Sequence, residues 1–191
     1  MLTLLFNFPV QFLMYIPGMI FFLRFLMQYA RCDFYHPVSQ FVYKVTAPFL
    51  KVFRNLCFDN INVAALLNMV LISFIIFTLF SLQGVQDGFS SVSLKDFAVL
   101  FAINIVFVVW TVIEILLILL IVTAVLSWIP SARGINIYLL TLLKPVTGFF
   151  DKYIPSIGYI SLSFLVVFLL LQFIDSTIMP RFLFFVIGLA K

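Results

Sequence analysis

The side chains best able to carry chemistry in this sequence are ionisable or amide groups set within apolar stretches. Glu114 is the deepest of them, with apolar neighbours for many positions on either side. A charged carboxylate in a hydrocarbon core is costly, so Glu114 must be protonated, paired or facing water. One interpretation is an intramembrane polar site for an ion or a proton, formed by Arg24, Asn68, Asn104 and Glu114. The other, which we favour, places Glu114 toward the outer interface, where it snorkels or bonds a helix partner.

The remaining reactive side chains form no catalytic or metal-binding pattern. His36 is the only histidine, so it cannot supply both axial ligands of a haem. Its spacing from Cys32, Asp33 and Cys57 matches no standard zinc motif. The two cysteines form neither a CxxC pair nor a disulfide framework, so we expect free thiols. Because the apolar stretches hold no histidine and no clustered carboxylate pair, we expect no enzyme activity, no metal and no cofactor.

Composition places the chain in the membrane class. Of its 191 residues, 65% are hydrophobic and only 9% are charged, and the mean hydropathy is +1.26. A soluble domain carries roughly a quarter charged residues, so a soluble globule is excluded. The net charge of +4 is too small and too scattered for a nucleic-acid surface, so we expect no nucleic-acid partner.

Four apolar segments are long enough to cross a bilayer as helices, and they give an all-α membrane protein with four transmembrane helices. The third segment exceeds one perpendicular crossing, so it must tilt, protrude or begin with an interfacial turn near residues 97–102. In the first segment, Pro17 and Gly18 predict a kink. The four segments are residues 10–30, 61–82, 97–128 and 160–179.

The loops that follow the first and third spans resemble each other. Pairing Tyr29 with Trp128 and Pro48 with Pro145 requires only a two-residue gap, and the spans that follow align from Ile61 and Ile160 onward. The resemblance predicts two repeats of the same orientation, each built as helix, amphipathic interfacial helix pair, helix. The repeats are residues 1–82 and 97–191, joined by residues 83–96.

The distribution of basic residues predicts the orientation. The two long loops, residues 31–60 and 129–159, hold seven Lys and Arg side chains, against three on the other side. By the positive-inside rule the long loops lie in the cytoplasm and both termini lie outside. Arg24 then lies one to two turns inside the cytoplasmic end of the first span, close enough to snorkel to the headgroups. Pairing with Asp33 or Asp59 is the alternative.

Both long loops have the pattern of amphipathic helices. In the first, apolar residues from Val38 to Phe53 recur at helical spacing. The second repeats the pattern from Leu139 to Tyr153. A proline in each loop should break the helix, so we expect a helix pair there. These helices either cap the bundle or dock a partner or lipid headgroups. The candidate docking residues are Asp33, Tyr35, Pro37, Gln40, Lys44, Pro48, Lys51, Arg54, Lys144 and Pro145.

The most specific stretch is residues 24–54, RFLMQYARCDFYHPVSQFVYKVTAPFLKVFR. It resembles the first repeat of the YggT family of bacterial inner-membrane proteins, which is related to the YlmG proteins. LSWIP from Leu126 and LKPVTGFFDKYIPSIGYISLS from Leu143 are similar to the second family repeat. Thr123 stands where that repeat usually has an arginine, the counterpart of Arg24. Ser161 and Phe164 replace a customary Asp and Pro.

The resemblance implies a multi-span protein of the bacterial inner membrane with no established enzyme activity. Relatives are linked to osmotic-stress tolerance, to cell-division gene neighbourhoods and, in plastids, to haem assembly and nucleoid organisation. Such varied links fit a scaffold or assembly factor that meets the bilayer and a membrane or cytoplasmic protein partner. A small ion or osmolyte channel, acting as an oligomer, is the alternative. Ala98 and Ala102 have the spacing that allows close helix contact in a homo-oligomer.

Overall fold

The computed structural model of this chain describes residues 8–54, 94–154 and 162–188, together with positions 65, 70, 71 and 75. Within these residues every regular element is helical and no strand occurs, which confirms the predicted all-α class. Apart from those four positions, the predicted second span and its candidate residue Asn68 lie outside the described residues.

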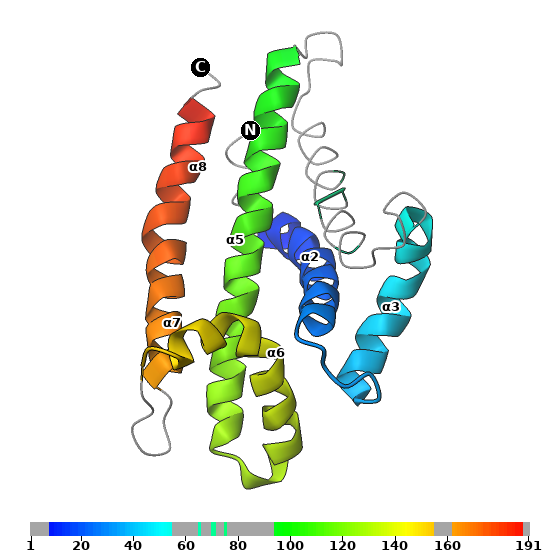
Figure 1. The fold of residues 1–191 in the computed structure, drawn as a ribbon. Helices are drawn as coiled ribbons and strands as arrows, with labels where there is room; N and C mark the ends of the chain where they lie inside the picture. Colours follow the sequence, from blue (N-terminus) through cyan, green and yellow to red (C-terminus); the bar gives the residue numbers. More distant parts are fainter. Residues whose placement is uncertain are drawn as a thin grey trace.

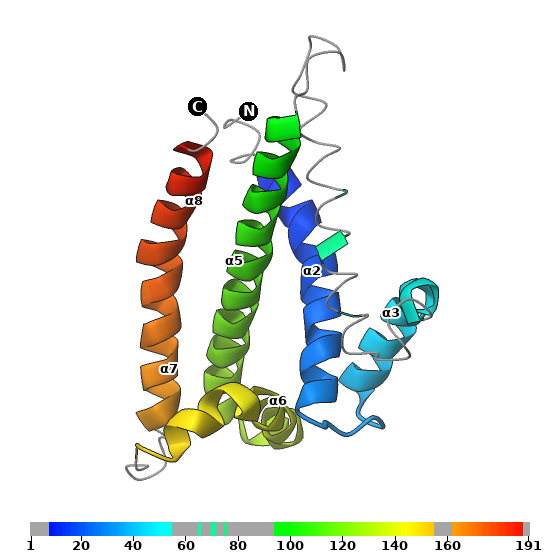
Figure 2. The ribbon, with the colours of Figure 1, turned by 45° about the horizontal axis from the view of Figure 1, so that its top comes forward.

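Three long helical rods and two shorter helices make up the described fold (Figure 1). Figure 2 shows α2 and α5 running in one direction and the α7–η3–α8 rod running in the other. The helix α6 and the start of α3 lie at the end where α2 and α5 finish. The elements are α2 (Phe8–Tyr29), α3 (Pro37–Arg54), α5 (Leu94–Ser127), the 3₁₀ turn η2 (Pro130–Ala132), α6 (Arg133–Asp151), α7 (Leu162–Phe173), the π-helical turn η3 (Ile174–Ile178) and α8 (Met179–Gly188).

Two helices are long and apolar enough to cross a membrane by length and composition. They comprise Phe101–Ser127 of α5 and Ser163–Val186 of the last rod, and α2 adds the shorter apolar stretch Ile16–Tyr29. The helix α5 has 34 residues, so at 1.5 Å per residue it measures about 50 Å, well beyond a hydrocarbon core of about 30 Å. It is one helix from Leu94 onward, so the interfacial turn considered near residues 97–102 does not form.

The last rod is longer than its sequence pattern predicts. We placed its end at residue 179, but the helix continues to Gly188 by way of a π-helical turn. In that turn the Met179 N–H donates to the Ile174 carbonyl, one residue further back than in an α-helix. Pro180 explains the widening, because it has no N–H and its ring crowds the carbonyl four residues earlier. The prediction treated this proline region as a helix end, whereas the wider turn accommodates it.

The predicted helix pairs in the two long loops are wrong. Pro48 lies inside the single helix α3 and Pro145 inside the single helix α6, as Pro17 lies inside α2. A proline removes one intrahelical hydrogen bond and displaces one carbonyl, and a bend is enough to accommodate both effects. Figures 1 and 2 show such a bend in α6, where the helix turns toward α7.

The helix α5 organises the core because it packs against α2, α6, α7 and α8. At its carboxyl half, Ile115 and Leu120 are fully buried in one cluster with side chains from α2 and α6. At its amino half, Ile103 and Val106 pack with Leu183 and Val186 of α8. Close packing of this kind stabilises helix association in a bilayer, where lipid tails are as apolar as the side chains.

Candidate functional site at the junction of α3 and α6

The turn between α2 and α3 is the most densely hydrogen-bonded irregular segment in the described part of the chain. Helix α2 ends with the Cys32 N–H donating to the Met27 carbonyl (3.0 Å) and the Arg31 N–H donating to the Gln28 carbonyl (3.2 Å). This is the Schellman pattern, in which a left-handed residue follows the helix. Arg31 occupies that position with φ of 53°, a conformation that usually favours glycine. The chain is therefore redirected sharply toward α3.

Asp33 and Gln40, both candidate docking residues, are exposed and also hold this turn together. The Asp33 Oδ1 accepts a bond from the Tyr35 N–H (2.9 Å), and its backbone carbonyl accepts one from the Ser39 hydroxyl (2.6 Å). The Gln40 amide donates to the Tyr35 carbonyl (3.3 Å). Pro37 is the first residue of α3, where its missing N–H costs nothing. These five residues fix where α3 begins and in which direction it leaves.

The turn also binds the helix of the second long loop. The hydroxyl oxygens of Ser39 and Tyr138 lie 2.7 Å apart, and both side chains are buried. Since the Ser39 hydrogen is used on the Asp33 carbonyl, the Tyr138 O–H is the donor between them. The His36 ring stacks on the Tyr138 ring, with centroids 3.9 Å apart and planes inclined by 8°. We call these three side chains the α3–α6 junction.

The sequence interpretation missed this junction. It treated Ser39 only as part of the family motif and His36 only as a failed metal ligand, and it left Tyr138 out of the apolar pattern of the second loop. The available signal was the position of Tyr138, four residues before the buried Leu142 on the same face of α6. Burial raises the pKa of the Tyr138 phenol and also that of the Cys32 thiol, so both groups stay neutral at physiological pH.

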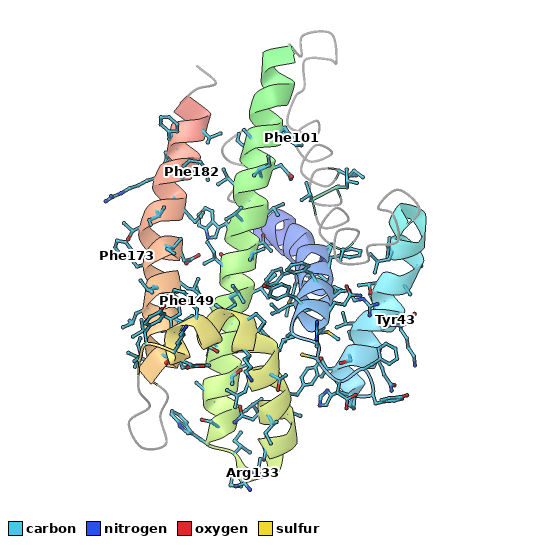
Figure 3. All side chains as sticks on the ribbon, in the orientation of Figure 1. Tyr43, Phe101, Arg133, Phe149, Phe173 and Phe182 are labelled. Carbon is cyan, nitrogen blue, oxygen red and sulfur yellow. The ribbon has the colours of Figure 1, made fainter. Side chains whose placement is uncertain are left out.

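Arg24 does not snorkel to the headgroups as predicted. It is only 7% exposed, and its Cζ lies 4.4 Å from the centre of the Tyr43 ring on α3. Figure 3 shows Tyr43 on the side of α3 that looks toward α2. The alternative partner Asp33 makes no ion pair with it in the described structure, and Asp59 lies outside the described residues. A cation over an aromatic face is attracted by the ring quadrupole, and this attraction ties α2 to α3.

The other intramembrane candidates are not gathered into one cluster. Asn104 is completely buried in α5, and within the described part of the chain neither the oxygen nor the nitrogen of its amide has a hydrogen-bond partner. Glu114 is half-buried ten residues further along the same helix, which places it about 15 Å away along the axis. Arg24 lies on α2 against Tyr43, so it belongs to the α2–α3 contact.

Helix α3 exposes apolar side chains on one flank. Its buried face consists of Ser39, Val42, Thr46 and Leu50. A second stripe at helical spacing runs beside this face, with Phe41 63% exposed and Phe49 51% exposed. The Phe49 ring also contacts Phe21 of α2 edge to face, with the ring centroids 5.9 Å apart. We call this second set, Val38, Phe41, Val45 and Phe49, the Phe41 stripe. Lys44 is exposed beside this stripe. The structure does not describe the side chains of Lys51 and Arg54.

A second polar contact joins α5 to the π-helical turn. The Trp110 Nε1 donates to the Asp175 Oδ1 at 2.7 Å, from one long rod to the other. The two residues are 65 positions apart along the chain, so no local sequence pattern links them. The π-turn places this carboxylate within reach of the indole. Phe173 and Phe182 lie on the outer side of the same rod (Figure 3), where both are at least half exposed.

The fold and the junction define a class: an all-helical protein with apolar helices compatible with a membrane, in which α3 is hydrogen-bonded to α6. The chain belongs to the CCB3/YggT family, whose family model matches residues 3–83 and 96–182.

Several bacterial proteins are similar over most of the chain. A protein from the proC 3′ region of Vibrio alginolyticus is 32% identical, covering 81% of this chain and 83% of its own length. The YggT protein of Escherichia coli K12 is 31% identical, covering 82% and 80%. PA0392 of Pseudomonas aeruginosa is also 31% identical, covering 82% and 79%. All three are described as uncharacterized. No solved structure matches this chain.

Proposed function

We propose that this protein is a non-enzymatic scaffold of the bacterial inner membrane that docks a protein partner on the Phe41 stripe of α3. The observation that carries the proposal is the contrast between the two sides of this helix. One side is fixed to α2 and α6 through the Arg24–Tyr43 contact and the α3–α6 junction. The neighbouring flank exposes Phe41 and about half of Phe49, whose ring also contacts Phe21 of α2. A rigidly held apolar face with aromatic residues is the usual form of a protein docking surface.

The proposed topology has four spans in two repeats of the same orientation, residues 1–82 and 97–191. Support comes from the family model, which matches the chain in two parts that correspond to these repeats. The parallel course of α2 and α5, with α6 and the start of α3 at one common end, agrees with that arrangement (Figure 2). The surplus of Lys and Arg in the long loops places that end in the cytoplasm. A scaffold of this form suits organisation of the envelope or of a division complex, or osmotic-stress tolerance.

Site-specific photo-crosslinking in cells tests the docking surface. A photoreactive phenylalanine analogue replaces Phe41 or Phe49 in the full-length protein, and captured proteins are identified by mass spectrometry. The matched control carries the same analogue at Phe173, which is 57% exposed on the opposite rod. The expected result is one protein captured reproducibly from positions 41 and 49 and not from 173. Capture of only lipid and the protein itself from all three positions would overturn the proposal.

The alternative, a small ion or osmolyte channel acting as an oligomer, has one observation in its favour. The amide of Asn104 is fully buried and has no hydrogen-bond partner among the described residues, which costs free energy unless another group, a water or an ion meets it. Flux through liposomes containing the parent protein or an Asn104→Leu variant tests this reading. Flux present in the parent and abolished in the variant would favour a channel. Equal, background-level flux in both would eliminate it.

A further inference from the structure

A large groove lies where α5, α6 and α7 meet. Its volume is about 850 Å³, and its walls are mostly apolar, with Ile121 and Val125 from α5 and Leu165 and Phe168 from α7. One face of α6 forms the rest of it, and this face carries the polar groups. Trp128 lies at the end of α5 beside the groove and is 82% exposed. An exposed tryptophan at a helix end is typical of the level of the lipid headgroups.

The proposed repeat pairs two residues of the groove with a contact of the first repeat. Thr123 corresponds to Arg24, and with the two-residue gap Leu140 corresponds to Tyr43. The guanidinium of Arg24 lies over the Tyr43 ring. Thr123 and Leu140 both line the groove, and the Thr123 hydroxyl turns back to donate to the Leu119 carbonyl (2.6 Å). The groove therefore has a short side chain at the position where the first repeat has a long cation.

The polar groups of the groove select a ligand that carries both charges. Lys144 and Asp151 both line it, and neither makes an ion pair within the described structure. They are seven residues apart on α6, which is about 10 Å along a helix. Asn136 also lines the groove, and its buried Oδ1 has no hydrogen-bond donor. One cation and two acceptors complement a ligand with an anionic group and an amine that has N–H donors.

We propose that this groove binds a single aminophospholipid of the phosphatidylethanolamine type. Lys144 holds the phosphate, Asp151 holds the ammonium, and an acyl chain lies along the apolar walls of α5 and α7. The groove lies on the second repeat and the Phe41 stripe lies on the first. The lipid site can therefore be refuted without refuting the scaffold function, and the scaffold function without refuting the lipid site.

Native mass spectrometry of the full-length protein tests the site. The protein is released from nanodiscs containing equal parts of phosphatidylethanolamine, phosphatidylglycerol and phosphatidylcholine, and the retained lipid is identified. The parent is expected to retain one phosphatidylethanolamine. Phosphatidylcholine has the same phosphate but no N–H donor, so it should be retained about tenfold less.

Two variants locate the lipid in the groove. Thr123→Arg introduces the residue that the first repeat has and places a long side chain in the groove, so it should reduce the retained lipid. Its matched control is Thr141→Arg, which adds the same charge on the exposed face of α6 outside the groove and should leave retention unchanged.

Two further variants test which residues bind the lipid headgroup. They keep the test decisive if Thr123→Arg fails to fold. Lys144→Gln should reduce retention of phosphatidylethanolamine about tenfold. Asp151→Asn should remove the preference for phosphatidylethanolamine over phosphatidylglycerol. Equal retention of all three lipids by the parent, preferred retention of phosphatidylglycerol, or loss of the lipid in Thr141→Arg as well, would each overturn the proposal.

Discussion

The two long loops start from one sequence pattern and end as two different sites. Beside the first loop a buried arginine on α2 lies against Tyr43 of α3. Beside the second loop Thr123 and Leu140 line a groove of about 850 Å³ where α5, α6 and α7 meet. One flank of α3 exposes Phe41, whereas the exposed flank of α6, with Lys144 and Asp151, forms a wall of the groove. A long cation on an aromatic ring therefore lies beside one loop, and a short hydroxyl in an open groove lies beside the other.

The largest effect is expected where the two loops meet. Tyr138→Ala removes the hydrogen bond to Ser39, the stacking on His36 and a buried ring at once. Loss of a buried aromatic ring costs about 3 kcal/mol, so thermal unfolding in detergent should begin at a clearly lower temperature. Tyr153→Ala on an exposed ring is the control and should change little. An equal, small effect in both variants would mean that the junction does not hold the repeats together.

The next largest effect concerns the closed contact of the first repeat. Tyr43→Leu introduces the residue found at the corresponding position of the second repeat, and it leaves Arg24 buried without its aromatic face. The loss should be about 1–2 kcal/mol, the range of a partly desolvated cation–π contact. Tyr43→Phe keeps the face and should be close to the parent in the same unfolding measurement. If Phe and Leu are equally destabilising, the phenol hydroxyl is the important group.

A smaller gain of stability is expected at the end of α2. Arg31 has φ of 53°, and a residue with a Cβ is strained there, whereas glycine is not. Arg31→Gly should therefore raise the free energy of unfolding by up to about 1 kcal/mol. Denaturant unfolding of the parent and the variant measures the difference. A lower stability in the glycine variant would show that the arginine side chain makes a compensating contact.

The smallest effect is a dependence of stability on alkaline pH. Burial raises the pKa of the Cys32 thiol, so the folded chain keeps this proton at a pH where the unfolded chain, with a thiol pKa of about 8.5, has lost it. The unfolded chain then binds fewer protons, and stability falls as the pH rises above that value. Cys32→Ser removes the titrating group, so its melting temperature should decline less between pH 8 and pH 10. Parallel declines in the two proteins would contradict this account.

Local features of the sequence were sufficient to predict where helices form but not where they end. Apolar runs predicted α2, α5 and the last rod, because a backbone in hydrocarbon must satisfy its own hydrogen bonds within a helix. The prolines misled the prediction at Pro48, Pro145 and Pro180. Whether a proline ends a helix or only bends it depends on what packs around it, and the sequence does not contain that information.

For the candidate polar residues, too, the sequence identified the side chains but not their partners. For Asp33 and Gln40 a role as contacts for a partner stays a prediction, and the structure adds hydrogen bonds of both residues within the turn. Arg24 was predicted at the headgroups and is instead buried. Each polar side chain at a helix end has several satisfactory partners, and only the folded chain shows which of them comes within hydrogen-bonding distance.

The sequence by itself determined the helical class, the membrane character and the family, because these follow from composition, apolar segment length and a motif read along the chain. Only the tertiary structure decided the contacts between segments far apart in sequence. Ser39 meets Tyr138 across 99 residues, and Trp110 meets Asp175 across 65. Such contacts depend on how helices pack, and packing is set by the shapes of many side chains together. A local pattern therefore predicts an element, while the position of a partner is fixed only when the elements assemble.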